Sequence, residues 1–339
     1  MVEMVETAEQ FNFPGEGTMS QKIIKAVGMM VVDYTLDGLD RNLTLLEDLG
    51  CESAEISPSA CKVICGGALN IARLRQILPI LAQRDLLYTV HSPLILNFMD
   101  EIHLELHKQV CRASIEWCAR IGAKILVIHP GWITAREMLT SLDRLMELER
   151  STILELAREA ADSGVKLALE NMPAVLGMLS GEKTNYGIDP LRVAEQVAAI
   201  DHPNVCATLD FSHAYISANF RNVALLETLK PYASYVNHLH VHDSVGRPPS
   251  LQDADTGEAL AFGMGDLHLP LGWGTLEWER ILPHLPIRPG TVMTVEIAKP
   301  YVTPDEIATS LQRARQFAEI LNQVPHPYND GESALLSPV

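Results

Sequence analysis

Three features of the sequence predict a single-domain α/β fold of the (β/α)8 TIM barrel class. Short apolar runs, rich in β-branched and aliphatic residues, recur eight times along the 339 residues. Amphipathic helical patterns separate these runs, so that strand and helix alternate as they do in a barrel. No GxGxxG follows the first run, which disfavours the alternative, a doubly wound sheet.

The expected strands are mostly apolar rather than strictly alternating, which is typical of parallel strands buried on both faces. They cover residues 25–32, 53–57, 87–92, 124–131, 166–172, 205–212, 236–244 and 291–298. The clearest helices between them are expected at 139–164, 191–200 and 304–321, where apolar residues recur at helical spacing.

The chain is longer than the roughly 250 residues that such a barrel needs. We assign the barrel to residues 25–322 and the excess to three segments: an N-terminal arm (1–24), an insertion after the seventh strand (245–265) and a C-terminal tail (323–339). The insertion is rich in Gly, Pro, Asp and Ser and is expected to be a loop. Long loops at this end of a barrel usually serve the active site.

Composition and charge exclude several classes of function. The formal net charge is −17, from 43 acidic and 26 basic residues, and no Lys/Arg cluster stands out, which argues against a nucleic-acid partner. No apolar run is long enough for a membrane span, and the acidic start lacks the layout of a signal peptide. The six cysteines have no CxxC spacing. These features predict a reduced, cytoplasmic protein.

Imidazole and carboxylate groups gather at the expected C-terminal ends of the strands, where barrel enzymes keep their active sites. Strands three to six contribute His91, His129, Glu170 and Asp210, with His213 just beyond, and strands seven and eight contribute His240 and Glu296. The motif "DLH" in the glycine-rich loop before strand eight adds two more groups. The nine candidate metal ligands are His91, His129, Glu170, Asp210, His213, His240, Asp266, His268 and Glu296.

A single histidine at a strand end is more often a hydrogen-bonded structural residue than a ligand, but nine such groups together point to metal binding. Four carboxylates in one mouth would repel each other and raise each other's pKa unless cations lay between them. Imidazoles and carboxylates without thiolates suit Zn²⁺, Mn²⁺ or Fe²⁺. Nine ligands exceed the needs of one ion, so two or three ions are expected.

Strand seven, "VNHLHVHDS", places His238, His240 and His242 on one face. His240 is favoured as the ligand, His242 lies nearer the rim and is expected to touch substrate, and His238 is interpreted as a hydrogen-bonded core residue. In strand two, Glu55 is compatible with either the barrel mouth or a salt bridge.

This constellation resembles the xylose isomerase-like barrel superfamily, and within it the endonuclease IV (AP endonuclease 2) branch. The resemblance runs through most of the barrel, and its strength lies in the order of the motifs rather than in any one of them. The motifs are "HSPLILN" (91–97), "IHPG" (128–131), "LEN" (169–171), "LDFSHAY" (209–215), "LHVHDS" (239–244), "DLHLPLGWG" (266–274) and "VEIAKP" (295–300).

The resemblance implies a trinuclear zinc centre that hydrolyses phosphodiesters with a bridging hydroxide as nucleophile. One ion would be bound by His91, His129 and Glu170. A second would share Glu170 and bind Asp210, His240 and Glu296, and a third would be bound by His213, Asp266 and His268. Glu170 and Glu296 are therefore the expected catalytic residues.

The chain departs from the nuclease pattern in ways that favour a small phosphodiester over DNA. Leu94 stands where the nucleases have an aromatic residue, Trp273 stands where they have an acid, and the insertion has no counterpart in them. A related group cleaves the nucleotide loop of cobamides, which is one expected substrate. Asn97, His242 and Trp273 are the expected substrate contacts.

A sugar or sugar-phosphate isomerase or epimerase is the competing function. Such relatives retain a single divalent ion, held by residues that correspond to Glu170, Asp210, His240 and Glu296, and use the two glutamates for proton transfer. The turn "GWGTLEW" (272–278) resembles a turn of those enzymes. A barrel without catalytic activity is disfavoured by so complete a set of ligands.

Overall fold

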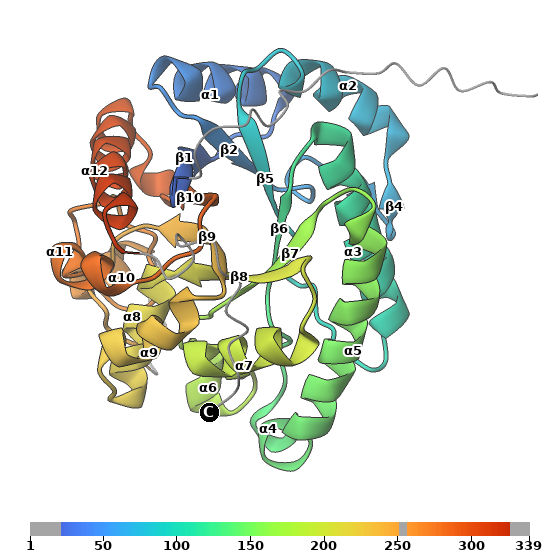
Figure 1. The fold of residues 1–339 in the computed structure, drawn as a ribbon, viewed down its shortest axis with the longest axis vertical. Helices are drawn as coiled ribbons and strands as arrows, with labels where there is room; N and C mark the ends of the chain where they lie inside the picture. Colours follow the sequence, from blue (N-terminus) through green and yellow to red (C-terminus); the bar gives the residue numbers. More distant parts are fainter. Residues whose placement is uncertain (1–21, 251–255, 326–339) are drawn as a thin grey trace, which may run out of the picture.

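Eight parallel strands close into a barrel in the computed structural model, which describes residues 22–250 and 256–325 (Figure 1). Each predicted strand is present, so the expected fold class is confirmed. Around the barrel the strands follow the order β1-β10-β9-β8-β7-β6-β5-β2. Their bounds are β1 Ile24–Met30, β2 Ser53–Ile56, β5 Leu87–His91, β6 Ile125–Ile128, β7 Lys166–Glu170, β8 Val205–Asp210, β9 Val236–Val241 and β10 Thr291–Val295.

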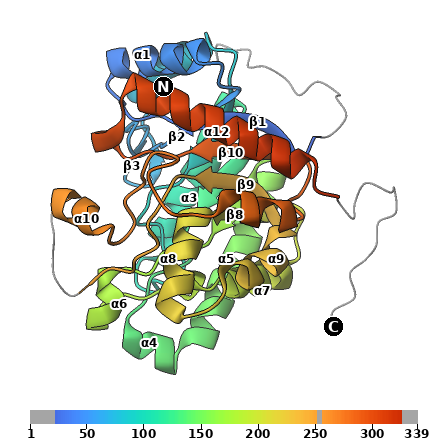
Figure 2. The same ribbon diagram turned by 90° about the vertical axis from the view of Figure 1, so that its left-hand side faces the viewer.

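Helices surround the barrel, as Figures 1 and 2 show from two directions. The helices of nine or more residues are α1 Leu36–Asp48, α2 Ile71–Leu81, α3 Leu104–Ile121, α5 Leu142–Ala161, α7 Pro190–Ile200, α8 Phe211–Arg221, α9 Leu225–Ala233 and α12 Pro304–Asn322. The shorter helices are α4 Ala135–Thr140, α6 Leu176–Ser180, α10 Thr256–Phe262 and α11 Trp278–Ile281, with 3-10 turns η1 Tyr186–Ile188, η2 Leu282–His284 and η3 Lys299–Tyr301. None of the described helices is long and apolar enough to span a membrane.

Three local features differ from the sequence prediction. The helix expected over 139–164 is two helices, α4 and α5, which meet at Ser141, whose φ of −141° is not helical. The loop after β2 contains a small hairpin, β3 Ile64–Cys65 with β4 Ala68–Leu69. The insertion was expected to be a loop throughout, which is wrong for α10: the segment TGEALAF contains strong helix formers.

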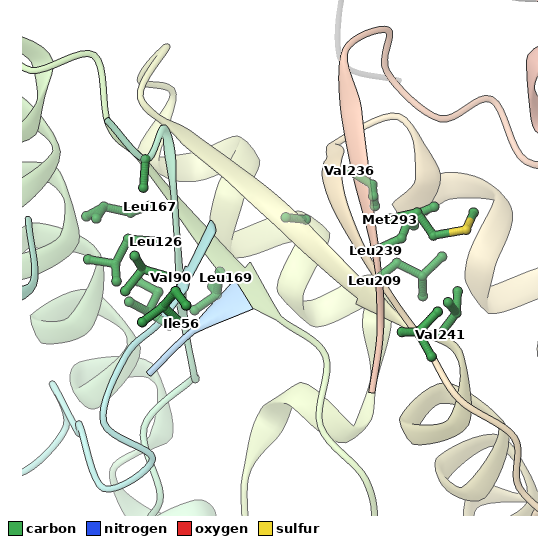
Figure 3. Packing of buried hydrophobic residues seen from close by; sticks show 14 of the residues in the cluster. Ile56, Val90, Leu126, Leu167, Leu169, Leu209, Val236, Leu239, Val241 and Met293 are labelled. Atoms are coloured by element: carbon green, nitrogen blue, oxygen red, sulfur yellow. The ribbon is translucent and has the colours of Figure 1, made fainter. Parts of the chain in front are cut away.

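The barrel has two apolar regions, one outside its wall and one inside. Outward-facing side chains such as Val90, Leu169 and Leu239 pack between the strands and the surrounding helices (Figure 3). A separate cluster forms a plug within the barrel and consists of Ile125, Val127, Ala168 and Cys206. Because side chains alternate between the two faces of a strand, the inward positions beyond this plug come at the carboxyl ends of the strands. Those positions carry the polar groups.

The first strand and the last helix of the barrel are joined by a hydrogen bond to a side chain. The backbone N–H of Ile24 donates to Oδ1 of Asn322, at 2.8 Å, so the first strand is tied to the end of the last helix. Most of the proposed arm (residues 1–21) and most of the proposed tail (residues 326–339) lie outside the described residues.

Candidate metal centre

The nine predicted ligands gather at the carboxyl ends of the strands. His91, Glu170 and Asp210 end β5, β7 and β8, and His240 is the fifth residue of β9. His129 and Glu296 each follow their strand by one residue, and His213 lies in the first turn of α8. The remaining two, Asp266 and His268, come from the loop after α10. Side-chain distances link all nine into one cluster.

Glu170 is the centre of this cluster, and its two carboxylate oxygens face different partners. Oε2 lies 3.5 Å from Nε2 of His91 and 3.2 Å from Nε2 of His129. Oε1 lies 3.1 Å from Nδ1 of His240 and 3.3 Å from Nδ1 of His213. A carboxylate with ligand atoms on both sides has the geometry needed to bridge two cations.

In two of the candidate histidines, His91 and His240, one ring nitrogen contacts a protein oxygen and the other faces the cluster. Nδ1 of His91 lies 2.9 Å from the carbonyl of Ser92, so Nε2 faces Glu170. Nε2 of His240 lies 3.1 Å from Oε1 of Glu55, so Nδ1 faces the cluster. Metal-binding histidines are commonly oriented by such an acceptor, which fixes the tautomer and the ring.

A second set of groups surrounds Nδ1 of His240. Besides Glu170, Glu296 lies 3.6 Å and Asp210 4.0 Å from this nitrogen. Asp210 is held by Asn171, whose amide nitrogen donates to the Asp210 carbonyl and whose Oδ1 accepts from the Asp210 N–H, both at 2.9 Å. The motif "LEN" thus supplies two groups. Its glutamate is a candidate ligand, and its asparagine positions the candidate ligand of the next strand.

The loop containing "DLH" forms a third set with His213. Oδ2 of Asp266 lies 3.0 Å from Nε2 of His268 and 3.1 Å from Nε2 of His213, while Nδ1 of His213 lies 3.0 Å from the carbonyl of Asn171. His268 has a φ of +47°, a left-handed conformation that is uncommon for a residue other than glycine and often marks a functional site.

The backbone around Asp243 holds this loop against β9. Asp243 and Leu269 exchange backbone hydrogen bonds, and Oδ2 of Asp243 accepts from the N–H of Gly272 at 2.8 Å. Gly274 is required at the end of the turn, because a Cβ there would lie 2.3 Å from Oδ1 of Asp243. The glycine turn after the "DLH" motif therefore fixes the position of Asp266 and His268 relative to β9.

His242 lies among the candidate ligands. It groups with His213, Asp266 and His268, and separately with Asp210 and Glu296. Its Nε2 is 2.9 Å from Oδ2 of Asp210, and its ring stacks on that of His268 with centroids 3.9 Å apart. The sequence analysis expected it to contact substrate; the structure places it, fully buried, between the second and third ligand sets.

Beneath the cluster, Glu55 and His238 form a buried polar layer. Oε2 of Glu55 lies 3.2 Å from Nε2 of His238 and accepts from Thr89 at 2.9 Å. Thr294 contacts the same His238 nitrogen at 3.2 Å. Glu55 therefore faces the barrel interior, where it orients His240, and His238 is the core histidine that the sequence indicated.

The electrostatics of the cluster favour positive charge. Burial would raise the pKa of Glu170, but the nearby imidazoles of His240, His129 and His213 hold it well below its usual range. Burial likewise opposes protonation of His268, yet Asp266 raises its pKa to about 9. The negative charge of the buried carboxylates thus favours positive charge at the cluster.

Two buried carboxylate oxygens indicate whether these residues are suited to bind a metal ion. Oε2 of Glu170 and Oδ1 of Asp266 have no hydrogen-bond partner, which is costly for a buried carboxylate in a folded protein. A divalent ion on each would satisfy them, and the His/Asp/Glu donor set suits Zn²⁺. The residues present therefore fit the metal centre that the sequence predicted.

The other two expected substrate contacts differ in their surroundings. Asn97 joins the loop after β5 to the loop after β6: its amide nitrogen donates to the Trp132 carbonyl at 2.8 Å and its Oδ1 accepts from the Met99 N–H at 3.0 Å. Trp273 is 48% exposed and packs against Tyr301, with ring centroids 5.8 Å apart. Leu94, at 64% exposure, lies free on the loop after β5.

Comparisons with known proteins agree with this architecture. Residues 43–320 match the family described as xylose isomerase-like TIM barrel. An uncharacterized protein of Methanocaldococcus jannaschii is 27% identical over 238 residues, covering 68% of this chain and 72% of its own length. A protein of Mesomycoplasma hyopneumoniae named probable endonuclease 4 is 26% identical over 175 residues, or 48% of this chain. The chain spans 56% of that relative's length.

Among solved structures, a D-tagatose 3-epimerase-like protein superposes with a TM-score of 0.65 at 21% identity, covering 88% of this chain and 98% of its own. This similarity concerns the fold. A protein named as a probable endonuclease and a protein named as epimerase-like are thus both among the similar proteins. The family match covers most of the chain, and the closed eight-stranded barrel carries the candidate ligands at one mouth. The chain therefore belongs to the xylose isomerase-like TIM barrel family.

Proposed function

We propose that this protein is a metal-dependent hydrolase of a small phosphodiester. The observation that carries the proposal is the position of Glu170, with two histidine nitrogens facing each of its carboxylate oxygens. An enzyme with a single ion does not need the first of these pairs, His91 and His129, as metal ligands. A centre with several ions needs them, together with a carboxylate that bridges.

The ligand sets accommodate three ions. The first set is His91, His129 and Glu170, and the second is Glu170, Asp210, His240 and Glu296. The third is His213, Asp266 and His268, with His242 beside it. The absence of thiolates and the abundance of imidazole favour Zn²⁺, with Mn²⁺ or Fe²⁺ as alternatives.

Bound divalent ions would supply a water of lowered pKa and would neutralise charge that develops on the phosphoryl group. The chain's own residues position these elements. Glu170 holds the first two sets in a fixed relation, and Glu296 faces both His240 and His268, each at 3.6 Å. Burial of Glu170 and Asp210 excludes water from the side of the cluster opposite the mouth.

The surroundings of the mouth favour a small substrate. The loops carry exposed apolar side chains, Leu94, Ile95, Phe262 and Trp273, and the chain as a whole has a net charge of −17. A DNA backbone is bound mainly by cationic side chains. A compact phosphodiester, such as the nucleotide loop of a cobamide, would contact Trp273 by its apolar part and the cluster by its phosphate.

Replacing Glu170 by Gln tests the proposal. Hydrolysis of bis(p-nitrophenyl) phosphate should fall by at least about 100-fold, because the amide cannot bridge two cations. The matched control is Glu101→Gln, the same chemical change at an exposed residue paired with Arg144, and it should leave turnover unchanged. Wild-type turnover in Glu170→Gln, with the fold verified by circular dichroism, would exclude the proposed role.

A sugar or sugar-phosphate epimerase remains the second candidate, because a complete single-ion site is present within the larger cluster. Nδ1 of His240 lies within 4.0 Å of carboxylate oxygens from Glu170, Asp210 and Glu296. In this function two glutamates would move a proton beside a carbonyl. Epimerisation of a ketose in deuterated water, read by exchange at the carbon next to the carbonyl, distinguishes it from hydrolysis.

A further inference from the structure

A cavity of about 590 Å³ lies beside the metal centre and has no part in it. It is lined by residues that follow β1, β2 and β10, including Tyr34, Lys62, Arg73 and Lys299. The carboxyl ends of parallel strands meet at one rim of a barrel, so the cavity opens on the same rim as the ligands. Lys299 is only three residues beyond Glu296 in the chain.

The cavity wall carries three cationic side chains, Lys62, Arg73 and Lys299, and one carboxylate, Asp33, which interacts electrostatically with Lys299. Arg73 donates to the carbonyls of Cys61 and Tyr34 and to the Gln76 side chain, all of them uncharged acceptors. These bonds fix the guanidinium without removing its charge. Lys62 and Lys299 are exposed, and neither forms an ion pair with any residue in the described part of the chain.

Two helices begin at the wall of the cavity. Thr35 is the N-cap of α1, which has 13 residues, and Asn70 is the N-cap of α2, which has 11. Helix N-termini carry partial positive charge and commonly bind anions. The N-terminus of α2 adds to the field of the three cationic side chains, whereas that of α1 also faces the Asp33 carboxylate.

One carboxylate, Asp33, also lines the cavity, and it is engaged by α1. Its Oδ1 accepts from the N–H and the hydroxyl of Thr35, at 3.0 and 2.9 Å. Its carboxylate lies against Gly38, where a Cβ would meet it at about 2.2 Å. Three cationic side chains against one acidic side chain leave the wall positive, in a chain whose overall balance is strongly negative.

We propose that this cavity binds a phosphate-type oxyanion, a second anionic group on the substrate whose reacting centre lies at the metal cluster. The inference of an anion site depends only on the cavity and the charged groups that line it. The identification of the reacting group as a phosphodiester rests on the proposed function. The substrate class is then a phosphodiester that carries an additional phosphate monoester.

Lysine footprinting on the full-length protein tests the site directly. Acylation of Lys62 and Lys299, quantified by mass spectrometry, should slow several-fold when inorganic phosphate is added. Lys230, on the outer helix α9 beside Glu227, is the control and should react at an unchanged rate. Equal acylation of all three lysines with and without phosphate would overturn the proposal.

A double variant, Lys62→Asn with Lys299→Gln, tests the substrate class. Asparagine suits position 62 because Lys62 has a φ of +58°, a conformation that asparagine tolerates. The kcat/KM for a phosphodiester bearing a phosphate monoester should fall about 10- to 100-fold, the effect of removing two charge-assisted contacts. Turnover of bis(p-nitrophenyl) phosphate, which lacks the second anion, should not change, and Lys230→Gln should affect neither substrate.

The outcomes separate the two proposals. If the protein hydrolyses no diester but phosphate still protects Lys62 and Lys299, the anion site holds and the proposed function fails. If both diesters are hydrolysed and the double variant affects them equally, the proposed function holds and the anion site is wrong.

Discussion

At the scale of single residues, His242 separates this cluster from the three-ion pattern expected from the sequence. Its Nε2 contacts Asp210 at 2.9 Å, its ring lies parallel to that of His268, and its Nδ1 is buried without a partner. A buried imidazole nitrogen without a hydrogen-bond partner is a candidate metal ligand. It would give the third ion four protein ligands instead of three.

We therefore expect His242→Asn to weaken binding of the most loosely held ion about 10- to 100-fold, the range seen when groups around a metal site are altered. Competition with a chromophoric chelator measures this affinity without reference to activity. His107→Asn, in a histidine that contacts the loop after β5, is the control. If His242→Asn retains full affinity and instead raises KM, His242 contacts substrate, as the sequence analysis expected.

That the nine candidate ligands lie together could be predicted because each one lies next to a recognisable strand or glycine turn. The groups that orient them could not. Asn171 contacts the neighbouring strand, Glu55 reaches His240 across the barrel interior, and the Ser92 carbonyl contacts the adjacent His91. The register of the closed barrel determines which inward-facing side chains contact each other. A single sequence does not reveal that register.

At the scale of elements, helix α5 supports the turn that carries His129. Glu149 on this helix is fully buried and accepts from the Gly131 N–H at 2.6 Å, from the Tyr186 hydroxyl and from Gln196 at 3.1 Å. Gly131 lies two residues beyond His129. The carboxylate thus joins the turn after β6 to η1 and α7.

Replacing Glu149 by Ala should lower the free energy of unfolding by about 3 kcal/mol, since it leaves three donors buried without their acceptor. Urea denaturation measures the loss. Glu147→Ala, on the same helix but paired with Arg150 at the surface, should cost less than about 1 kcal/mol. Equal stability of the two variants would show that Glu149 has no supporting role.

Sequence patterns located this helix but not the role of Glu149 or the break before it. An acidic residue in an amphipathic helix is usually solvated, so its burial gives no signal in the sequence. The break at Ser141 follows a capping box, Thr134 with Glu137, which starts α4 independently. Apolar periodicity continues across the break, which is why one helix was expected.

At the scale of the whole molecule, charge is distributed unevenly. Carboxylates and imidazoles fill the mouth, cations gather in the neighbouring cavity, and exposed apolar residues lie on the loops between. Composition indicated the acidic total but not this segregation. The alternation of eight strands and helices was enough to predict the barrel, because each βα unit repeats the same local pattern.

The number of bound ions tests the central claim most directly. Plasma mass spectrometry of the purified, full-length protein, after dialysis against metal-free buffer, should give close to three equivalents of transition metal per chain, mostly zinc. This count follows from the proposed assignment of one ion to each of the three ligand sets around Glu170, His240 and Asp266. A reproducible value of one equivalent would contradict the three-ion hydrolase and favour the single-ion epimerase.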